Sequence, residues 1–255
     1  MMSQAVSARL WPAAAASLWL AACVTGGESS KPQQASAYNT QLGIEYLRQN
    51  NLSQAKEKID RALEQDPQNG MAHAAAGLLY DRLGDKRRAD REFARAVSLE
   101  PDNADILNNY AVFLCRNGEP DRGQKYFLEA ARNPLYRTPE VALLNAARCA
   151  RDAGDLPGAD ELLRDAVAVR PAFADALLQL ADLQFALGNA LPARGFLERY
   201  FAAGGAGPQS LLLGVRIEKE LGNERSAADY ATRLKNEYPT SRQTRDLLRA
   251  ERGGA

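Results

Sequence analysis

Small and large apolar residues recur along residues 36–240 with a period of about 34 residues. Prolines mark this period at Pro67, Pro101, Pro171 and Pro239, which lie 34, 70 and 68 residues apart in turn. Because a proline ends a helix and disfavours helical backbone in the residue before it, we place one proline near the end of each unit. The resulting unit starts are residues 36, 70, 104, 140, 174 and 208.

The positions of the smallest residues predict two closely packed helices in each unit. We count positions from the first residue of each unit. Position 15 is glycine in five of the six units, and glycine adopts the left-handed backbone that ends a helix at low cost. Larger apolar residues at positions 4, 7, 11 and 24 would fill the space around the small ones. This arrangement resembles the tetratricopeptide repeat, which implies a stack of helix pairs. Position 20, where the paired helices would approach most closely, holds Ala55, Ala89, Gly123, Ala159, Ala193 and Ala227.

The composition agrees with helices. The chain has 46 Ala and 34 Leu, which favour helices, against 8 Val and 4 Ile, which favour strands. A fold built on a sheet is therefore improbable. We predict an all-α fold, a right-handed α-solenoid of six tetratricopeptide repeats with a short C-terminal capping helix.

Two places depart from the regular repeat. Two residues are added within 133–139, which predicts a longer turn between the third and fourth repeats. Residues 241–255 form a cap and tail, in which Ser241 caps a short helix over 243–249 that covers the sixth repeat. Residues 252–255 are expected to be a frayed tail.

Residues 1–22 have the pattern of a signal peptide. Arg9 is their only charged side chain, and the apolar run from Leu10 to Leu20 has 11 residues, too few to span a bilayer. The run ends in Leu20-Ala21-Ala22-Cys23. This ending resembles the lipobox of bacterial lipoproteins.

The lipobox resemblance implies that Cys23 is lipidated and begins the mature chain. Residues 23–35 are polar and rich in small residues, so we predict a flexible tether there. In Gram-negative lipoproteins an Asp after the Cys usually means retention in the inner membrane, so Val24 implies the outer membrane. The alternative is an ordinary secretory signal whose cleavage site precedes a Cys.

Chemistry typical of enzymes is missing from the sequence. No glycine-rich phosphate loop follows a strand, and no G-x-S-x-G motif occurs. His73 is the only histidine, and its position in the second repeat predicts a packing residue rather than a general base. Three cysteines without a C-x-x-C pair favour neither a metal nor a cofactor. With 32 basic and 32 acidic residues, the chain has no net attraction for nucleic acid. We predict a protein that is not an enzyme.

Two cysteines occupy neighbouring repeats. Cys115 and Cys149 lie 34 residues apart, near the ends of the first helices of repeats three and four. First helices of neighbouring repeats pack side by side in this fold, and exported proteins meet an oxidising compartment. We therefore hypothesise a disulfide that joins these repeats. Two buried free thiols are the alternative.

The inner groove of such a solenoid predicts where a partner binds. Its surface is apolar in repeats one and two, while repeats three and four carry amides and arginines that bind peptide backbone and carboxylates. A helix or an extended peptide would fit the groove, although simple solvation of these helices is the alternative. The candidates are Thr40, Ile44, Leu47, Met71, Leu78, Asn108, Asn109, Val112, Arg116, Asn145 and Arg148, together with Ala37, Ala74 and Arg151.

One stretch is more specific than the general repeat. Residues 108–118 read NNYAVFLCRNG, which resembles the N-N-Y-x-x-F-L-C stretch of the PilF/PilW type IV pilus biogenesis lipoproteins. Residues 142–150 and 197–200 give supporting matches, and the six repeats match the number in that family.

The resemblance implies a function. Members of this family are pilotins that help the pilus secretin, a PilQ-like protein, reach the outer membrane and form its multimeric ring. It implies a location on the periplasmic face of that membrane, attached by lipid, with the secretin as partner and no small-molecule substrate. One alternative is a general envelope scaffold for barrel or peptidoglycan assembly machinery. A hydrolase is the second alternative, and the absence of catalytic motifs disfavours it.

Overall fold

The structure is a computed structural model that describes residues 31–253, and thirteen α-helices account for the regular structure in that range. Six of them are the first helices of the pairs: α1 (Lys31–Arg48), α3 (Gly70–Arg82), α5 (Ala104–Arg116), α7 (Pro139–Asp152), α9 (Ala174–Ala186) and α11 (Pro208–Glu220). Their partners are α2 (Leu52–Gln65), α4 (Lys86–Leu99), α6 (Pro120–Arg132), α8 (Leu156–Val169), α10 (Ala190–Ala202) and α12 (Glu224–Glu237). The last helix is α13 (Arg242–Gly253).

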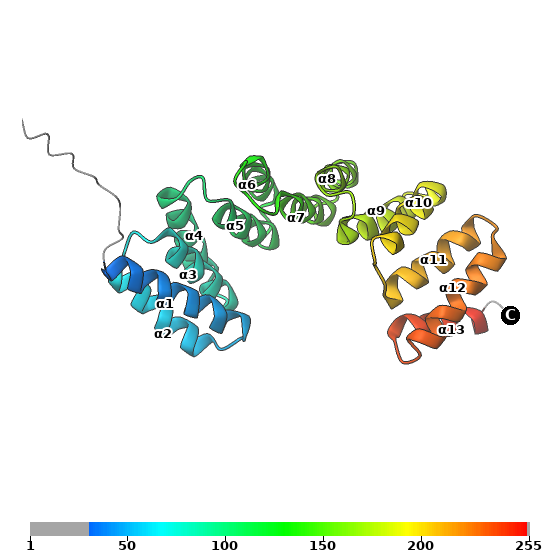
Figure 1. The fold of residues 1–255 in the computed structure, drawn as a ribbon, viewed down its shortest axis with the longest axis horizontal. Coiled ribbons are helices and arrows are strands. Elements are labelled where there is room, and N and C mark those ends of the chain that lie inside the picture. The colour runs from blue at the N-terminus through cyan, green and yellow to red at the C-terminus, as the bar shows by residue number, and fades with distance from the viewer. Residues whose placement is uncertain (1–30, 254–255) are drawn as a thin grey trace, which may run out of the picture.

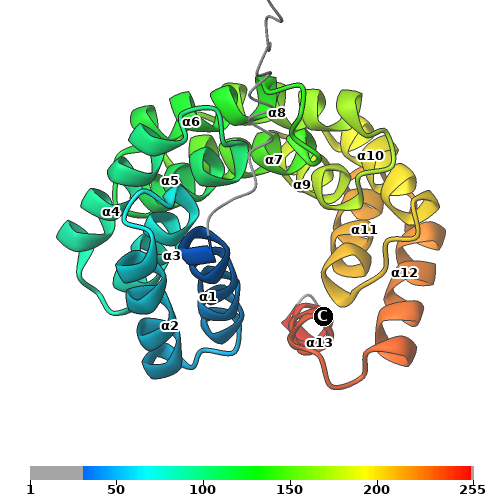
Figure 2. The ribbon, with the colours of Figure 1, turned by 60° about the vertical axis from the view of Figure 1, so that its left-hand side comes forward.

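The helix pairs stack side by side into an open arch (Figures 1 and 2). The first helix of each pair lines the inner side of the arch, and the second helix forms its outer side (Figure 2). The end helices α1 and α13 face each other across the opening (Figure 2). The predicted all-α solenoid of six tetratricopeptide repeats is confirmed, and the described residues contain no strand.

Small residues let the paired helices touch, as the sequence pattern predicts. Gly77 of α3 faces the ring of Phe93 on α4, and a Cβ added there would lie 2.8 Å from that ring. Ala89 of α4 is fully buried at the same contact. Five turns between paired helices end in glycine at positive φ, for example Gly84 at 80°. In the first repeat the turn residue is Asn50, at φ 57°.

The core runs along the whole arch between the inner and outer helices. Its best packed aromatic group joins repeats two and three, where Phe93 of α4 meets Tyr110 and Phe113 of α5. The ring centroid of Phe93 lies 5.5 Å from that of Tyr110 and 5.3 Å from that of Phe113. A larger cluster around Leu163, Leu177 and other buried apolar residues continues from α7 to α11.

Both ends of the described chain are more helical than the sequence analysis expects. The tether expected over 23–35 is wrong for its last residues, because α1 already begins at Lys31. Pro32 lies in the first turn, where its missing N–H costs nothing, and good helix formers follow it. At the other end α13 extends to Gly253 and not to 249, because Lys235 of α12 pairs with Glu251 at 2.8 Å. Residues 1–30 and 254–255 lie outside the described part of the chain.

Candidate partner-binding site

The first repeat has an open face that is covered in the other repeats. Tetratricopeptide stacking packs each first helix against the preceding repeat, but α1 is the first helix in the described part of the chain. In α3, the residues that face the preceding repeat include Ala72, Ala75 and Leu79, all at most 1% exposed. The matching residues of α1 include Tyr38, which is 65% exposed. The C-terminal end is different, because α13 covers the sixth repeat through buried Leu247.

A cleft of about 650 Å³ lies on this open face, between α1 and the start of α3. Its apolar part includes Leu42 and Ile44 of α1 and Met71 of α3, all of them half-buried. Charged Glu45 and Arg48 lie at its exposed side. An apolar floor with a polar rim is the composition of a small binding site for a peptide or helix. The complete lining is Ala37, Tyr38, Thr40, Gln41, Leu42, Ile44, Glu45, Arg48, Asn69 and Met71.

Three of the predicted groove residues are buried in the structure. Leu47 is only 3% exposed and packs in the core with Ile59 and Leu79, so a partner cannot reach it. Thr40 is 4% exposed; its Oγ1 donates to the Ser36 carbonyl at 2.8 Å and accepts from Asn69 Nδ2 at 3.3 Å. Both are buried where α3 packs against α1, the expected side-by-side contact of first helices, although Thr40 still borders the cleft. Ala74, the third buried member of the predicted groove, is 1% exposed.

The remaining predicted groove residues are half-buried or exposed. Ile44 and Met71 belong to the cleft, whereas Leu78 lies between the first two core clusters and Val112 packs beside Phe127. Five polar members from repeats three and four contact polar residues across the repeats: Asn108, Arg116, Asn145, Arg148 and Arg151.

Polar contacts join neighbouring inner helices along the middle of the arch. Arg116 of α5 pairs with Asp81 of α3 at 3.1 Å, and Asn145 of α7 donates to the amide oxygen of Asn108 at 3.2 Å. The amide oxygen of Gln179 on α9 faces α7 and accepts two hydrogen bonds from the Arg148 guanidinium, at 2.7 and 3.0 Å. Arg151 pairs with Asp182 at 3.7 Å. These contacts connect neighbouring repeats, and Asn109 is half-buried.

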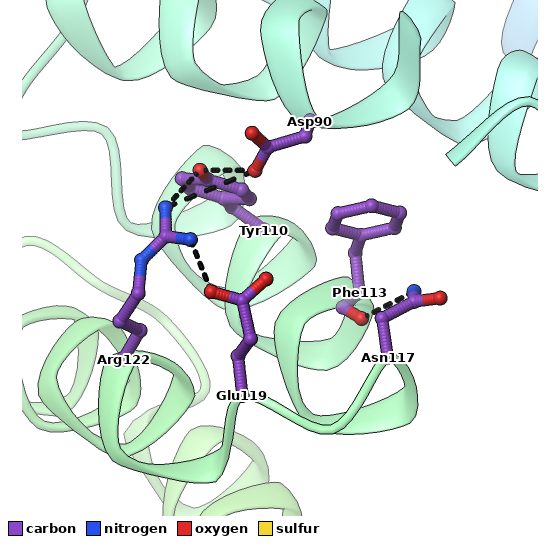
Figure 3. A network of polar contacts seen from close by, with 6 residues as sticks. All are labelled: Asp90, Tyr110, Phe113, Asn117, Glu119 and Arg122. Atoms are coloured by element: carbon purple, nitrogen blue, oxygen red, sulfur yellow. Dashed lines mark hydrogen bonds and ion pairs between the residues drawn. The ribbon is translucent and has the colours of Figure 1, made fainter. Parts of the chain in front are cut away.

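The tyrosine of the N-N-Y stretch is a structural residue. Tyr110 is 1% exposed, and its hydroxyl donates to Asp90 of α4 and accepts from Arg122 of α6, each at 2.7 Å (Figure 3). Arg122 also pairs with Glu119. Burial, reinforced by the hydrogen bond to Asp90, raises the pKa of the Tyr110 hydroxyl well above its usual range, so the group remains a donor. Tyr110 thus connects repeats two and three and is not available to a partner.

The two cysteines predicted to pair are adjacent. Cys115 of α5 and Cys149 of α7 form a disulfide in the structure, with Cα atoms 5.7 Å apart. Gly123 makes room for it, because a Cβ at that position would collide with the sulfur of Cys115. This explains why the third repeat has Gly where the others have Ala. Cys23, the predicted lipidation site, lies outside the described residues.

His73 lies between helices, as the sequence predicts. Its ring nitrogens contact the Glu92 carboxylate at 2.7 Å and the Pro67 carbonyl at 3.1 Å, and its side chain is 15% exposed. It therefore joins α3 to α4 and to the preceding turn. In the described part of the chain, no group of three or more His, Cys, Asp or Glu side chains has the geometry to hold a metal ion.

None of the helices between residues 31 and 253 combines the length and apolar character that crossing a membrane requires.

Comparison with known proteins assigns the family. Models of the tetratricopeptide repeat match residues 40–85, 72–103 and 92–125. The type IV pilus assembly protein PilF of Pseudomonas aeruginosa is 30% identical over 229 residues, which cover 87% of this chain and 90% of PilF. The chain belongs to the PilF/PilW family of tetratricopeptide-repeat proteins. A crystal structure of PilW, described as a widely conserved type IV pilus biogenesis factor, is 34% identical with a TM-score of 0.73, over 84% of this chain and 99% of PilW. The solved structure of P. aeruginosa PilF also has a TM-score of 0.73, at 28% identity, over 87% of this chain and all of PilF.

Membership of the PilF/PilW family gives the protein a role related to type IV pili in the cell envelope. The repeat scaffold makes this a protein-interaction role. The open cleft at α1 is the candidate surface for that interaction.

Sequence reasoning missed most of the cleft. Tyr38, Gln41 and Glu45 fall on positions that pack against the preceding repeat, so they were not expected to face a partner. The available signal was that the periodic pattern starts with this repeat, at residue 36. These positions hold large or polar residues in α1, whereas Ala72, Ala75 and other small or apolar residues occupy them in α3.

Proposed function

We propose that this protein is an outer-membrane lipoprotein that acts as a pilotin. It binds a segment of the pilus secretin and promotes the localisation of that secretin and its assembly into a multimer. The observation that supports this most directly is the open apolar cleft at α1 in a member of a pilus biogenesis family. The same proposal makes Cys23 the site of lipid attachment.

The cleft suits a partner segment that is apolar on one side. Leu42, Ile44 and Met71 would cover the apolar side of a helix or strand, while Glu45 and Arg48 would contact its polar edge. Covering such a segment prevents its aggregation before the secretin assembles. A lipid anchor confines the adaptor to the membrane surface and thereby raises the effective concentration of secretin subunits near it.

A complementation experiment tests the proposal. The gene is deleted and replaced by the wild type, by Ile44→Glu or by Cys23→Ser, and heat-resistant secretin multimers and twitching motility are measured. Ile44→Glu introduces a carboxylate into the apolar cleft, so we expect secretin monomers to accumulate. Leu191→Glu is the matched control, because Leu191 is 59% exposed on α10, outside the cleft, and should behave as the wild type. Circular dichroism of each purified variant checks that the fold is retained.

The expected outcomes separate the pilotin from a general envelope scaffold. The Cys23→Ser protein should fractionate as a soluble periplasmic protein and leave the secretin mislocalised. A deletion strain with normal multimers and normal twitching would contradict the proposal. Loss of many unrelated outer-membrane barrel proteins in that strain would favour the scaffold instead.

A further inference from the structure

The outer surface of α4 carries an unusual row of positive charge. Lys86, Arg87, Arg91 and Arg95 are all exposed, and we call these four residues the α4 basic face. Arg87, Arg91 and Arg95 follow one another at four-residue steps, so they lie on one side of the helix and repel each other. The helix is on the outer side of the arch (Figure 2).

The other outer helices balance their charges, and α4 does not. Each of the five other outer helices has an ion pair between residues four apart, which favours the helix. No carboxylate in the described chain lies within ion-pair distance of a member of the α4 basic face; the nearby Asp85 pairs with Arg88 instead. The balanced pairs are Lys56–Asp60, Lys125–Glu129, Arg164–Asp160, Arg194–Glu198 and Arg233–Glu237.

An apolar side chain lies beside this positive charge. Leu83, in the turn before α4, is 51% exposed. It lines an open hollow of about 650 Å³ together with Gly84, Asp85, Lys86, Arg87, Arg88 and Arg91, so basic side chains outnumber the one carboxylate there. Positive side chains around an exposed leucine are the combination that binds the headgroup region of an anionic bilayer.

We propose that the α4 basic face contacts anionic phospholipid headgroups and orients the arch on the membrane. From Lys86 to Arg95 the face extends about 14 Å along the helix on the convex side of the arch, so it presents a ridge to a broad surface. Protein interfaces, in contrast, have an apolar or aromatic centre. Among the described residues, Leu83 is the only exposed large apolar side chain beside the face, which suits headgroups better than a protein partner.

The choice of a membrane rests on the proposed lipoprotein function. Lys31, where α1 begins, is eight positions after Cys23, and eight residue steps span at most about 28 Å. A lipid on Cys23 therefore keeps the first two repeats close to a bilayer. With α4 on the membrane, the inner side of the arch faces the periplasm.

Vesicle binding by the full mature chain with Cys23→Ser tests this contact without the anchor. Vesicles of phosphatidylglycerol and phosphatidylethanolamine are compared with vesicles of phosphatidylcholine alone, by co-sedimentation. We expect binding only to the anionic vesicles, weakening as salt rises from about 0.05 to about 0.5 M. Adding Arg87→Gln, Arg91→Gln and Arg95→Gln should weaken binding by more than about tenfold, because each charge near the surface contributes several-fold.

A matched control removes the same charge elsewhere. Arg61→Gln, Arg132→Gln and Arg225→Gln change three exposed arginines on α2, α6 and α12 that form no ion pair in the described chain, and should alter binding less than about twofold. Thermal melts of both triple variants check folding. Equal loss in the two triple variants, equal binding to neutral vesicles, or no binding to anionic vesicles would overturn the inference. The pilotin proposal fails separately, in the secretin multimer assay.

Discussion

Phe93→Ala is expected to lower the free energy of unfolding of the mature protein by about 3–5 kcal/mol. Phe93 is fully buried, touches Gly77 of its own repeat and packs on the rings of Tyr110 and Phe113 in the next. Removing its ring leaves a cavity at the contact between repeats two and three. Because each repeat of a solenoid contacts only its neighbours, the other repeats cannot compensate for that loss.

Denaturant titration followed by circular dichroism measures this effect. Tyr38→Ala is the control, since Tyr38 is an aromatic residue that is 65% exposed, and its loss should change the free energy of unfolding by less than about 0.5 kcal/mol. If Phe93→Ala unfolds at the same denaturant concentration as the Tyr38→Ala control, repeats two and three do not pack as described. Two separate transitions in Phe93→Ala alone would instead agree with a weakened contact between them.

Replacing both Cys115 and Cys149 with serine is expected to cost about 3–4 kcal/mol of stability. The estimate follows from the 34-residue separation of the two cysteines, because the cross-link removes loop-closure entropy from the unfolded chain. The link also joins the C-terminal ends of α5 and α7, the first helices of repeats three and four. Thermal or denaturant unfolding of the Cys23→Ser background, with and without the double substitution, measures the difference.

Reductant supplies the control for the cysteine pair. Reduction should destabilise the Cys23→Ser protein to about the level of the double serine variant and should leave that variant unchanged. Mass spectrometry of alkylated, non-reduced protein reports the pairing itself. Alkyl groups on both Cys115 and Cys149 would show that the thiols are free, and the stability difference should then be small.

The repeating part of the fold could be predicted because its packing is local. Helices α3, α5, α9 and α11 begin at 70, 104, 174 and 208, the unit starts that the proline and small-residue pattern indicates. Gly77 and Ala89 are small because a neighbouring helix lies against each of them, and the same contact returns in every repeat. A feature that recurs six times is visible in the sequence even when any single instance is weak.

Features that occur only once were harder to predict. The cleft lies on a face of α1 that later repeats cover in their own first helices, because no helix pair precedes α1 in the described part of the chain. The Asp90–Tyr110–Arg122 contact joins three helices and leaves no periodic trace. The charges of the α4 basic face are visible in the sequence, but their lack of acidic partners appears only in three dimensions.

The central claim is that this arch binds the pilus secretin through the open face of its first repeat. Retention of secretin from detergent-solubilised envelope on the immobilised mature protein, detected by immunoblot, tests it most directly. We predict that the wild type and Leu191→Glu retain secretin and that Ile44→Glu, folded by circular dichroism, does not. No secretin on any of the three proteins, with an envelope extract shown to contain it, would contradict the account.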